Sequence, residues 1–281
     1  MRRLLLCLAM VLPTFTLANA QQIRDGEGLL RAMHDRYQAT WYSTLTFTQK
    51  TTTYKPDGTS KVDMWHEAAL LPGKLRIDFG DPNDGNGALF VDGNVTLFRG
   101  GKVSGSRANV NILLVLGFDV YRHPPENTMN VVKGEGYDLT KLREDVWEGR
   151  PAYVVGAGKG DSTSKQFWVE KDTLLFVRVV EPSQNDPKTL DDIRFLDYRK
   201  LEGGWVAARV EVKVADKIVF TEEYSDIQAG VKLDPGTFDP SHSAGPTGKN
   251  REDEESLLGL ASGDPNKKNC KQGLEGVWRQ R

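Results

Sequence analysis

The stretch from residue 44 to residue 67, TLTFTQKTTTYKPDGTSKVDMWHE, decides the fold class. In its first part Leu45 and Phe47 alternate with threonines, and this period of two is typical of a half-buried β-strand. Residues 56–58, PDG, then form a combination that is typical of a turn between antiparallel strands. Alternation resumes after the turn, with Met64 predicted on the apolar face. The stretch therefore predicts a β-hairpin.

The same period continues through most of the chain that follows. Leu75, Ile77 and Phe79 alternate with charged residues, and turn-forming residues occur at nearly every junction between such runs. The further strand candidates are residues 88–92, 94–99, 152–156, 165–170, 173–181, 190–199, 204–215 and 217–225. About eleven antiparallel strands are therefore predicted, in an all-β sheet that curls over its own core. Periodicity alone leaves open whether this sheet closes into a barrel or remains an open half-barrel covered by helices.

Two segments depart from the period of two. Residues 25–40 predict an amphipathic helix, because apolar residues from Leu29 to Tyr37 recur at three- and four-residue spacing. Residues 110–116 are almost wholly apolar and fit either a buried strand or a short helix. The helix is favoured because leucine is frequent in the segment.

Both ends of the chain differ in composition from the part between them. A basic start, the apolar residues 4–17 and the sequence ANA at 18–20 have the order of a secretory signal peptide. We therefore expect cleavage after Ala20 and export to the periplasm. Gly, Ser, Pro, Asn and charged residues dominate residues 241–281, which are expected to form a disordered polar tail. Residues 21–240 are the predicted domain.

The overall composition excludes several classes of protein. With 38% hydrophobic residues the chain is not wholly disordered, and a net charge of −2 argues against binding nucleic acid through bulk charge. No apolar run reaches the roughly 20 residues that cross a bilayer, which excludes a polytopic membrane protein.

The predicted domain carries no recognisable catalytic or metal-binding motif. Its histidines show neither H-E-x-x-H nor another helical metal spacing, and G-x-S-x-G is absent. Residues 156–160, GAGKG, lack the spacing of a phosphate-binding loop and predict a hairpin turn. Residues 81–87 depart from a calcium loop at the required glycine. Beyond the signal sequence only Cys270 remains, so neither an internal disulfide nor a cysteine metal cluster is possible. We therefore predict no enzyme, no cofactor and no metal.

Several short motifs, taken in order, resemble the LolA-type periplasmic lipoprotein carriers and the broader family of outer-membrane lipoprotein-sorting proteins. The match covers roughly residues 21–240, and each motif alone is short. The motifs are FTQK at 47–50 after the first helix, Trp65, PGKLR at 72–76, LFVDG at 89–93, WEGRPAY at 147–153, QFWV at 166–169 and the closing segment 233–238.

The resemblance implies an open antiparallel half-barrel whose concave face holds the acyl chains of a lipoprotein or lipid. An apolar trough suffices for this, because burying a hydrocarbon chain gains about 0.8 kcal/mol per CH₂. It also implies a membrane donor complex and an outer-membrane acceptor as partners. The net charge predicts no nucleic-acid partner. The trough candidates are Leu45, Phe47, Met64, Ile77, Phe79, Leu89, Leu97 and Phe167, and the candidates for a lid or plug are Ile112, Leu113 and Leu116.

One position departs from the family pattern. The best-known carriers have an arginine before the proline that follows the second strand, where it helps to latch the lid, and this chain has Leu71. The departure puts that latch in doubt. A sensor or scaffold that binds a protein partner on the same fold therefore stays open as an alternative, as does a secreted hydrolase with an unrecognised site.

Overall fold

The computed structural model describes residues 23–161, 163–183 and 189–241, and this part of the chain forms thirteen strands, three α-helices and three short 3-10 helices. The α-helices are α1 (Gly26–Tyr37), α2 (Ile112–Gly117) and α3 (Pro125–Gly134). The 3-10 helices are η1 (Pro82–Asp84), η2 (Asp119–Tyr121) and η3 (Pro235–Phe238). The strands are β1 (Thr44–Tyr54), β2 (Ser60–Leu70), β3 (Lys74–Phe79), β4 (Gly87–Val91), β5 (Asn94–Arg99), β6 (Lys102–Ala108), β7 (Leu142–Trp147), β8 (Arg150–Val155), β9 (Gln166–Glu170), β10 (Phe176–Pro182), β11 (Leu190–Lys200), β12 (Trp205–Val214) and β13 (Lys217–Ala229).

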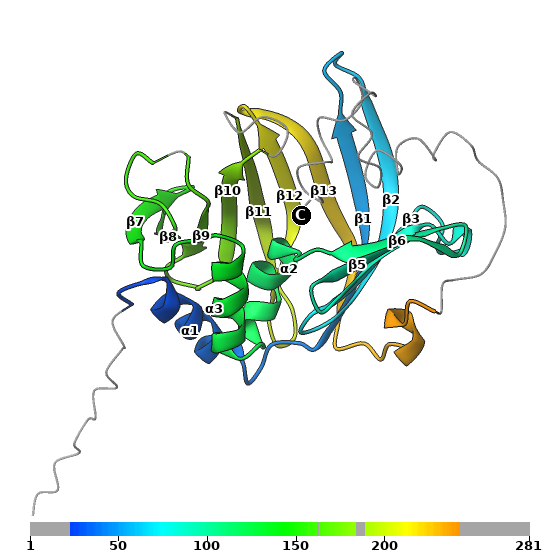
Figure 1. The fold of residues 1–281 in the computed structure, drawn as a ribbon, viewed down its shortest axis with the longest axis horizontal. Coiled ribbons are helices and arrows are strands. Elements are labelled where there is room, and N and C mark those ends of the chain that lie inside the picture. Colours follow the sequence, from blue (N-terminus) through cyan, green and yellow to red (C-terminus); the bar gives the residue numbers. More distant parts are fainter. Residues whose placement is uncertain (1–22, 162, 184–188, 242–281) are drawn as a thin grey trace, which may run out of the picture.

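All thirteen strands belong to one open antiparallel sheet in the order β6-β5-β4-β3-β2-β1-β13-β12-β11-β10-β9-β8-β7. The chain starts at the centre with β1 and runs outward by hairpins to the edge strand β6. It then crosses through α2, η2 and α3 to the opposite edge strand β7, and returns by hairpins until β13 pairs with β1. The sheet curls around the helices as an open half-barrel (Figure 1).

The helices pack on one face of the sheet, which we call the inner face. Helix α1 begins at Asp25, whose side chain accepts a hydrogen bond from the Gly28 N–H at 2.7 Å and so satisfies one of the unpaired donors at the helix start. Its Leu29, Leu30 and Met33 are fully buried. Each of these side chains contributes about 1.5–3 kcal/mol through the apolar surface it removes from water. Amphipathicity therefore fixes how α1 lies on the sheet.

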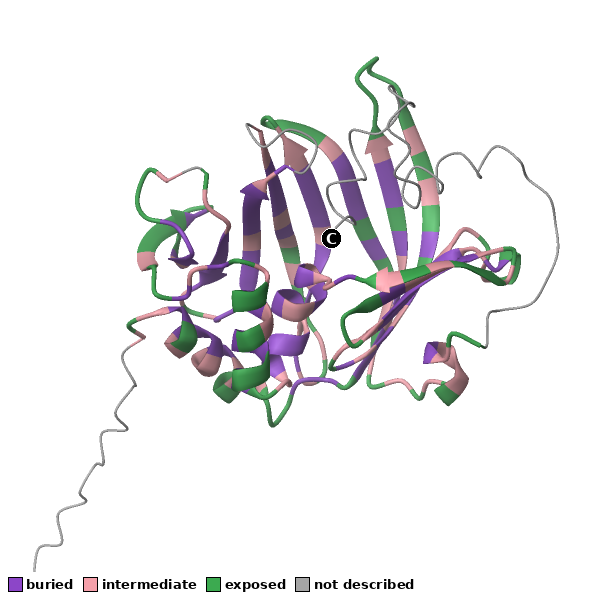
Figure 2. Cartoon of the chain, viewed as in Figure 1, coloured by how far each residue is buried: buried purple, intermediate pink, exposed green. Residues whose placement is uncertain are grey.

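Buried residues concentrate on α2 and on the central strands behind it, whereas α3 carries many exposed residues (Figure 2). The largest hydrophobic cluster joins the helices to the inner face. Two smaller clusters lie apart from it, one around Trp147 and Trp168 and one around Leu89, Phe98 and Phe238. Because successive strand residues point to opposite faces, these two clusters mark the outer face of the sheet.

The structure corrects the predicted number of elements. Strands β6 and β7 and helix α3 were not among the predicted elements, and the apolar segment near residue 112 is a helix, as favoured. No helix of the described ranges is both long and apolar enough to cross a membrane. The expected signal peptide, the expected tail from residue 242 onward and Cys270 lie outside the described residues.

Candidate functional site: the cavity under helix α2

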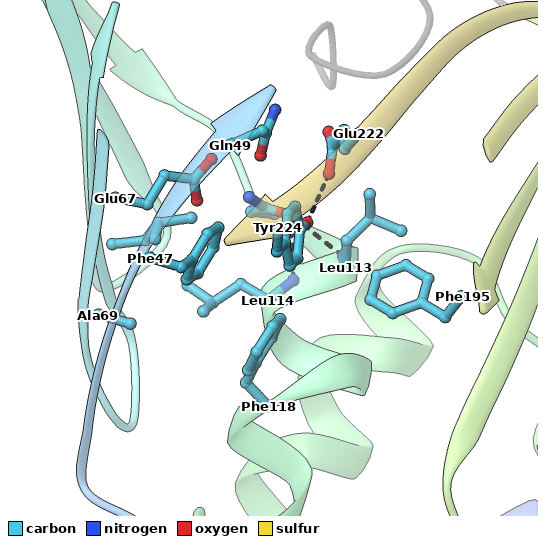
Figure 3. A pocket seen from close by; sticks show the side chains of 12 residues that line it. Phe47, Gln49, Glu67, Ala69, Leu113, Leu114, Phe118, Phe195, Glu222 and Tyr224 are labelled. Carbon is cyan, nitrogen blue, oxygen red and sulfur yellow. Dashed lines mark hydrogen bonds between the residues drawn. The ribbon is translucent and has the colours of Figure 1, made fainter. Parts of the chain in front are cut away.

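A cavity of about 40 Å³ lies between helix α2 and the inner face of the sheet. Figure 3 shows it from close by, with α2 on one side and strands β1, β2 and β13 on the other. The lining residues are Phe47 and Gln49 on β1, Glu67 and Ala69 on β2, Leu75 on β3, Phe195 on β11, Glu222 and Tyr224 on β13, and Asn111, Leu113, Leu114 and Phe118 in and beside α2.

Helix α2 owes its start to Asn111. The Asn111 side-chain oxygen accepts hydrogen bonds from the backbone N–H groups of Leu113 and Leu114, both at 3.1 Å. A helix of only six residues is unstable by itself, so this cap and the packing of its leucines on the sheet hold it in place. The cap stabilises the first turn of the helix, and the packing of its leucines turns its apolar side towards the inner face of the sheet.

The segment that follows α2 is tied to the sheet by polar contacts. Asp119 accepts a hydrogen bond from the Gly73 N–H at 3.0 Å, Tyr121 accepts one from the Phe176 N–H at 2.9 Å, and Arg122 donates one to the Trp41 carbonyl. Burial raises the pKa of Asp119 to about 7, against the opposing effect of the Gly73 hydrogen bond. These contacts anchor η2 firmly.

Helix α2 itself is held differently. Among the described residues, the hydrogen bonds of Ile112 to Gly117 stay within the helix and its cap. Leu71, at the position where the best-known carriers have arginine, is buried in the inner-face cluster and supplies no charge. Within the described part of the chain, α2 itself thus meets the sheet through apolar contacts, while polar contacts lie on both sides of it, from the Asn109 N–H to the Gly93 carbonyl before it and from the Gly73 N–H to Asp119 after it.

The cavity has a polar end formed by Gln49, Glu67 and Glu222. Tyr224 stacks on Phe47 with 4.3 Å between ring centroids and donates a hydrogen bond from its hydroxyl to Glu222 at 2.5 Å. Burial raises the pKa of Glu222 to about 7, and burial followed by repulsion from Glu222 raises the pKa of Glu67 well above its usual value. Within the described ranges, no group of three or more His, Cys, Asp or Glu side chains is arranged to hold a metal ion.

The structure brings two of the predicted site residues, Phe47 and Leu113, to the cavity wall. Seven others belong to the inner-face cluster or pack against it, yet do not line this cavity: Leu45, Ile77, Phe79, Leu97, Phe167, Ile112 and Leu116. Their part in a trough remains a prediction.

Met64 and Leu89 lie elsewhere, which corrects the strand phase predicted from the sequence. On β2 the buried inward residues are Trp65, Glu67 and Ala69, so Met64 points outward and is 43% exposed. Leu89 packs in the outer-face cluster with Phe98 and Phe238. A shift of one residue in phase moves a strand side chain to the other face, and we leave both residues out of the site.

The polar end of the cavity was not predicted from the sequence. A signal for it exists, because Glu222 lies between Phe220 and Tyr224 at a spacing of two, and Glu67 lies between Trp65 and Ala69 in the same way. A carboxyl that shares the phase of buried neighbours must face the core.

No protein-family model and no curated protein matches the sequence. Solved structures do match in shape. An outer membrane lipoprotein-sorting protein domain from Vibrio parahaemolyticus aligns with a TM-score of 0.51 at 14% identity over 76% of this chain and 96% of that chain. A LolA superfamily protein from Nitrosomonas europaea aligns with a TM-score of 0.50 at 15% identity over 74% and 96%. The chain has a LolA-like fold.

The resemblance in the sequence motifs is thus confirmed at the level of the fold. A DUF1329 family protein from Desulfovibrio piger also aligns, with a TM-score of 0.48 at 19% identity over 77% of this chain and 96% of that chain. In the LolA-like fold of the present chain, the cavity lies where α2 covers the open inner face of the half-barrel.

Proposed function

We propose that this protein is a non-enzymatic periplasmic carrier that binds the acyl chains of a lipoprotein or lipid and transports them towards the outer membrane. One observation carries the proposal: α2 covers the apolar inner face through apolar contacts alone and leaves a cavity beneath it. The LolA-like fold supports it. Residues 1–20 serve as the signal peptide, residues 21–240 bind the lipid, and a membrane donor and an outer-membrane acceptor complete the route.

The size of the cavity shows whether the binding site is open or closed to an acyl chain. A volume of about 40 Å³ holds a few water-sized groups, because one water needs roughly 10–15 Å³, and an acyl chain is far larger. The described structure is therefore the closed form, and binding requires α2 to move away from Phe47 and Tyr224. The chain that enters gains about 0.8 kcal/mol per buried CH₂, which offsets the cost of separating the apolar side of the helix from the sheet.

The proposal is tested with two matched substitutions in α2. Leu113 lines the cavity, whereas Val115 packs against the inner-face cluster away from it, and both are half-buried. We expect Leu113→Asp to weaken the binding of a fluorescent monoacylglycerol at least tenfold and Val115→Asp to weaken it much less. Both variants should keep a cooperative thermal transition. Equal binding by wild type and Leu113→Asp, or no binding by the wild type, would contradict a carrier of this design.

The proposed location is tested separately. N-terminal sequencing of the protein from a periplasmic extract should begin at Gln21. A chain that retains Met1 and sediments with membranes would contradict the proposed export and cleavage.

A further inference from the structure

Three hydrogen-bond acceptors gather at the polar end of the cavity. Gln49, Glu67 and Glu222 come from the neighbouring strands β1, β2 and β13, and all three side chains line the cavity (Figure 3). In the strand register Glu67 is paired with Phe47 and Glu222 with Thr51, so Gln49 lies between the two carboxyls along β1. The sheet therefore brings three oxygen-bearing groups to one point.

Gln49 leaves one of these acceptors unused. The residue is 1% exposed, and its amide nitrogen donates to the Thr51 hydroxyl at 2.9 Å. Its side-chain oxygen has no hydrogen-bond partner. A buried polar atom without a partner is unfavourable and uncommon in native proteins, so it calls for an explanation.

Neither carboxyl takes part in an ion pair within the described residues. Glu222 interacts with neutral donors, the hydroxyl of Tyr224 and the amide of Gln49, and the charged group that raises the pKa of Glu67, after burial, is Glu222. The described residues that line the cavity include no Lys, Arg or His. A buried carboxylate normally has a cation nearby, because burial of an unpaired charge is costly. The polar end of the cavity thus offers two carboxyls that a bound cation would hold in the ionised form and one acceptor without a partner, with no basic side chain among its described lining residues.

We propose that this polar end binds a primary ammonium group at the head of an acyl or alkyl chain, in a complex with Gln49, Glu67 and Glu222. The inference rests on the proposed function, since the chain of such a ligand would occupy the trough under α2. A primary ammonium carries three N–H donors and one positive charge, which match the three acceptors and the unpaired carboxyls. Its volume is close to that of water, so it fits the closed cavity even though the chain does not.

The chemistry of the cavity selects against the other common head groups. A phosphate or carboxylate would meet no basic side chain among the described lining residues, and either carboxyl in its ionised form would repel it. A quaternary ammonium has the charge but no N–H to donate. An uncharged hydroxyl supplies one donor and leaves the carboxyls without a counter-charge.

The ionisation of the cavity supports the inference. The titratable groups that face it are Glu67 on β2 and Glu222 and Tyr224 on β13, while α2, β3 and β11 contribute none. Because the pKa of Glu222 is raised to about 7 by burial, part of the protein carries a proton there at neutral pH. An ammonium ion favours the carboxylate form, so its binding should release a proton near pH 7.

The test compares four ligands that share one twelve-carbon chain: dodecylammonium, dodecyltrimethylammonium, dodecanol and dodecanoate. Each displaces fluorescent monoacylglycerol from the full mature chain, below the concentration at which it forms micelles. We expect dodecylammonium to bind at least tenfold more tightly than the other three. Calorimetry in buffers of different ionisation enthalpy should show proton release for dodecylammonium and none for dodecanol.

Isosteric variants assign the preference to the cavity. Glu222→Gln and Glu67→Gln should each reduce the preference for dodecylammonium over dodecanol about tenfold. Both substitutions remove a buried carboxyl without changing the side-chain volume, so both variants should melt no lower than wild type. A reduced ammonium preference in these variants is then not explained by unfolding. The control is Glu223→Gln, because Glu223 is exposed beside Glu222 and pairs with Lys50 outside the cavity at 2.8 Å.

Two negative results are distinct. If all four ligands bind alike, or if Glu222→Gln keeps the ammonium preference, the head-group inference is wrong and the carrier function stands. If neither the monoacylglycerol nor any of the four binds, both proposals are wrong.

Discussion

Two buried carboxyls on opposite faces of the same sheet show what decides the charge of such a group. Asp192 on the outer face is 8% exposed and Glu222 on the inner face is 7% exposed, so both residues are largely shielded from solvent. Burial by itself would raise the pKa of Asp192, yet hydrogen bonds from Arg178 and Arg194 outweigh it, and the pKa lies below its usual value. The pKa of Glu222 is instead raised to about 7 by burial. The presence or absence of a basic partner therefore decides whether the pKa of the buried carboxyl is lowered or raised.

The surroundings of the two carboxyls differ accordingly. Asp192 accepts hydrogen bonds at 2.6–3.0 Å from both arginines. The Arg178 guanidinium in turn lies 4.9 Å from the ring centroid of Trp168 and 5.5 Å from that of Trp147. Asp192 thus has two basic partners within the chain, whereas the inner-face carboxyls face a cavity. We therefore regard the outer network as structural and the inner group as a binding site.

The largest effect should appear in the pH dependence of stability. Glu222 and Asp119 hold protons up to about pH 7 in the native state, whereas the unfolded chain releases them near pH 4. The native state thus binds more protons between these values, so stability is greatest at low pH and falls as the pH rises through 7. Between pH 5 and pH 8 we expect a loss on the order of 2 kcal/mol from each group, measured by urea unfolding.

Glu222→Gln should remove the part of this loss that Glu222 contributes, on the order of 2 kcal/mol, and stabilise the protein at pH 8. The lowered pKa of Asp192 acts in a separate window, since its stabilisation is present at neutral pH and is lost only below about pH 4. A stability that is flat from pH 5 to pH 8 in the wild type would show that the inner carboxyls are not buried as described.

The second effect concerns the outer network. Asp192→Asn leaves the guanidinium groups of Arg178 and Arg194 without their carboxylate, and we expect a loss of about 2–3 kcal/mol in the free energy of unfolding. The arginines are partly exposed, which places the value below that of a fully buried pair. Equilibrium unfolding at pH 7 measures it, with Glu223→Gln as an exposed ion-pair control that should change stability by less than about 1 kcal/mol. If Asp192→Asn leaves the free energy of unfolding unchanged, the outer-face carboxyl does not depend on its arginines, and the proposed difference between the two faces is wrong.

The sequence predicts the central strands of the sheet better than the edge strands. Strands in the middle of the sheet, such as β1 and β3, bury one face and show alternation. The edge strand β6 is mostly exposed and the edge strand β7 buries only Trp147 fully, so neither sequence shows an apolar period and both strands were missed. Helix α3 was missed for a related reason, because its first residue Pro125 follows another proline, a polar stretch comes next, and the helix buries only a few residues.

The candidate site was predicted only in part. Leu113 was found because leucines in a short apolar run indicate a packed helix, and Phe47 because the phase of β1 is unambiguous. The phase of β2 is ambiguous in the sequence, because both Met64 and Trp65 are apolar, and in the structure Trp65 is the one that packs on the inner face. Glu67 lies two residues further along β2 and therefore also points to the inner face. Its meeting with Glu222 depends on the pairing of β1 with both β2 and β13, which no local pattern specifies.

The smallest effect tests whether the inner face is more mobile than the outer one. Asn111→Ala removes the cap of α2 and should cost about 1 kcal/mol, whereas Asn111→Ser keeps a capping oxygen and should cost a few tenths. Because α2 is held to the sheet by apolar contacts alone, the loss should appear as local opening. Hydrogen exchange at the α2 amides should rise about fivefold in Asn111→Ala, with no change at β8 and β9, which carry part of the outer-face cluster and no residue of the cavity wall. The same variant should bind fluorescent monoacylglycerol more tightly, since less free energy is needed to displace the helix. Equal protection of α2 in all three proteins, or weaker binding by Asn111→Ala, would show that α2 is a fixed part of the core and not a lid.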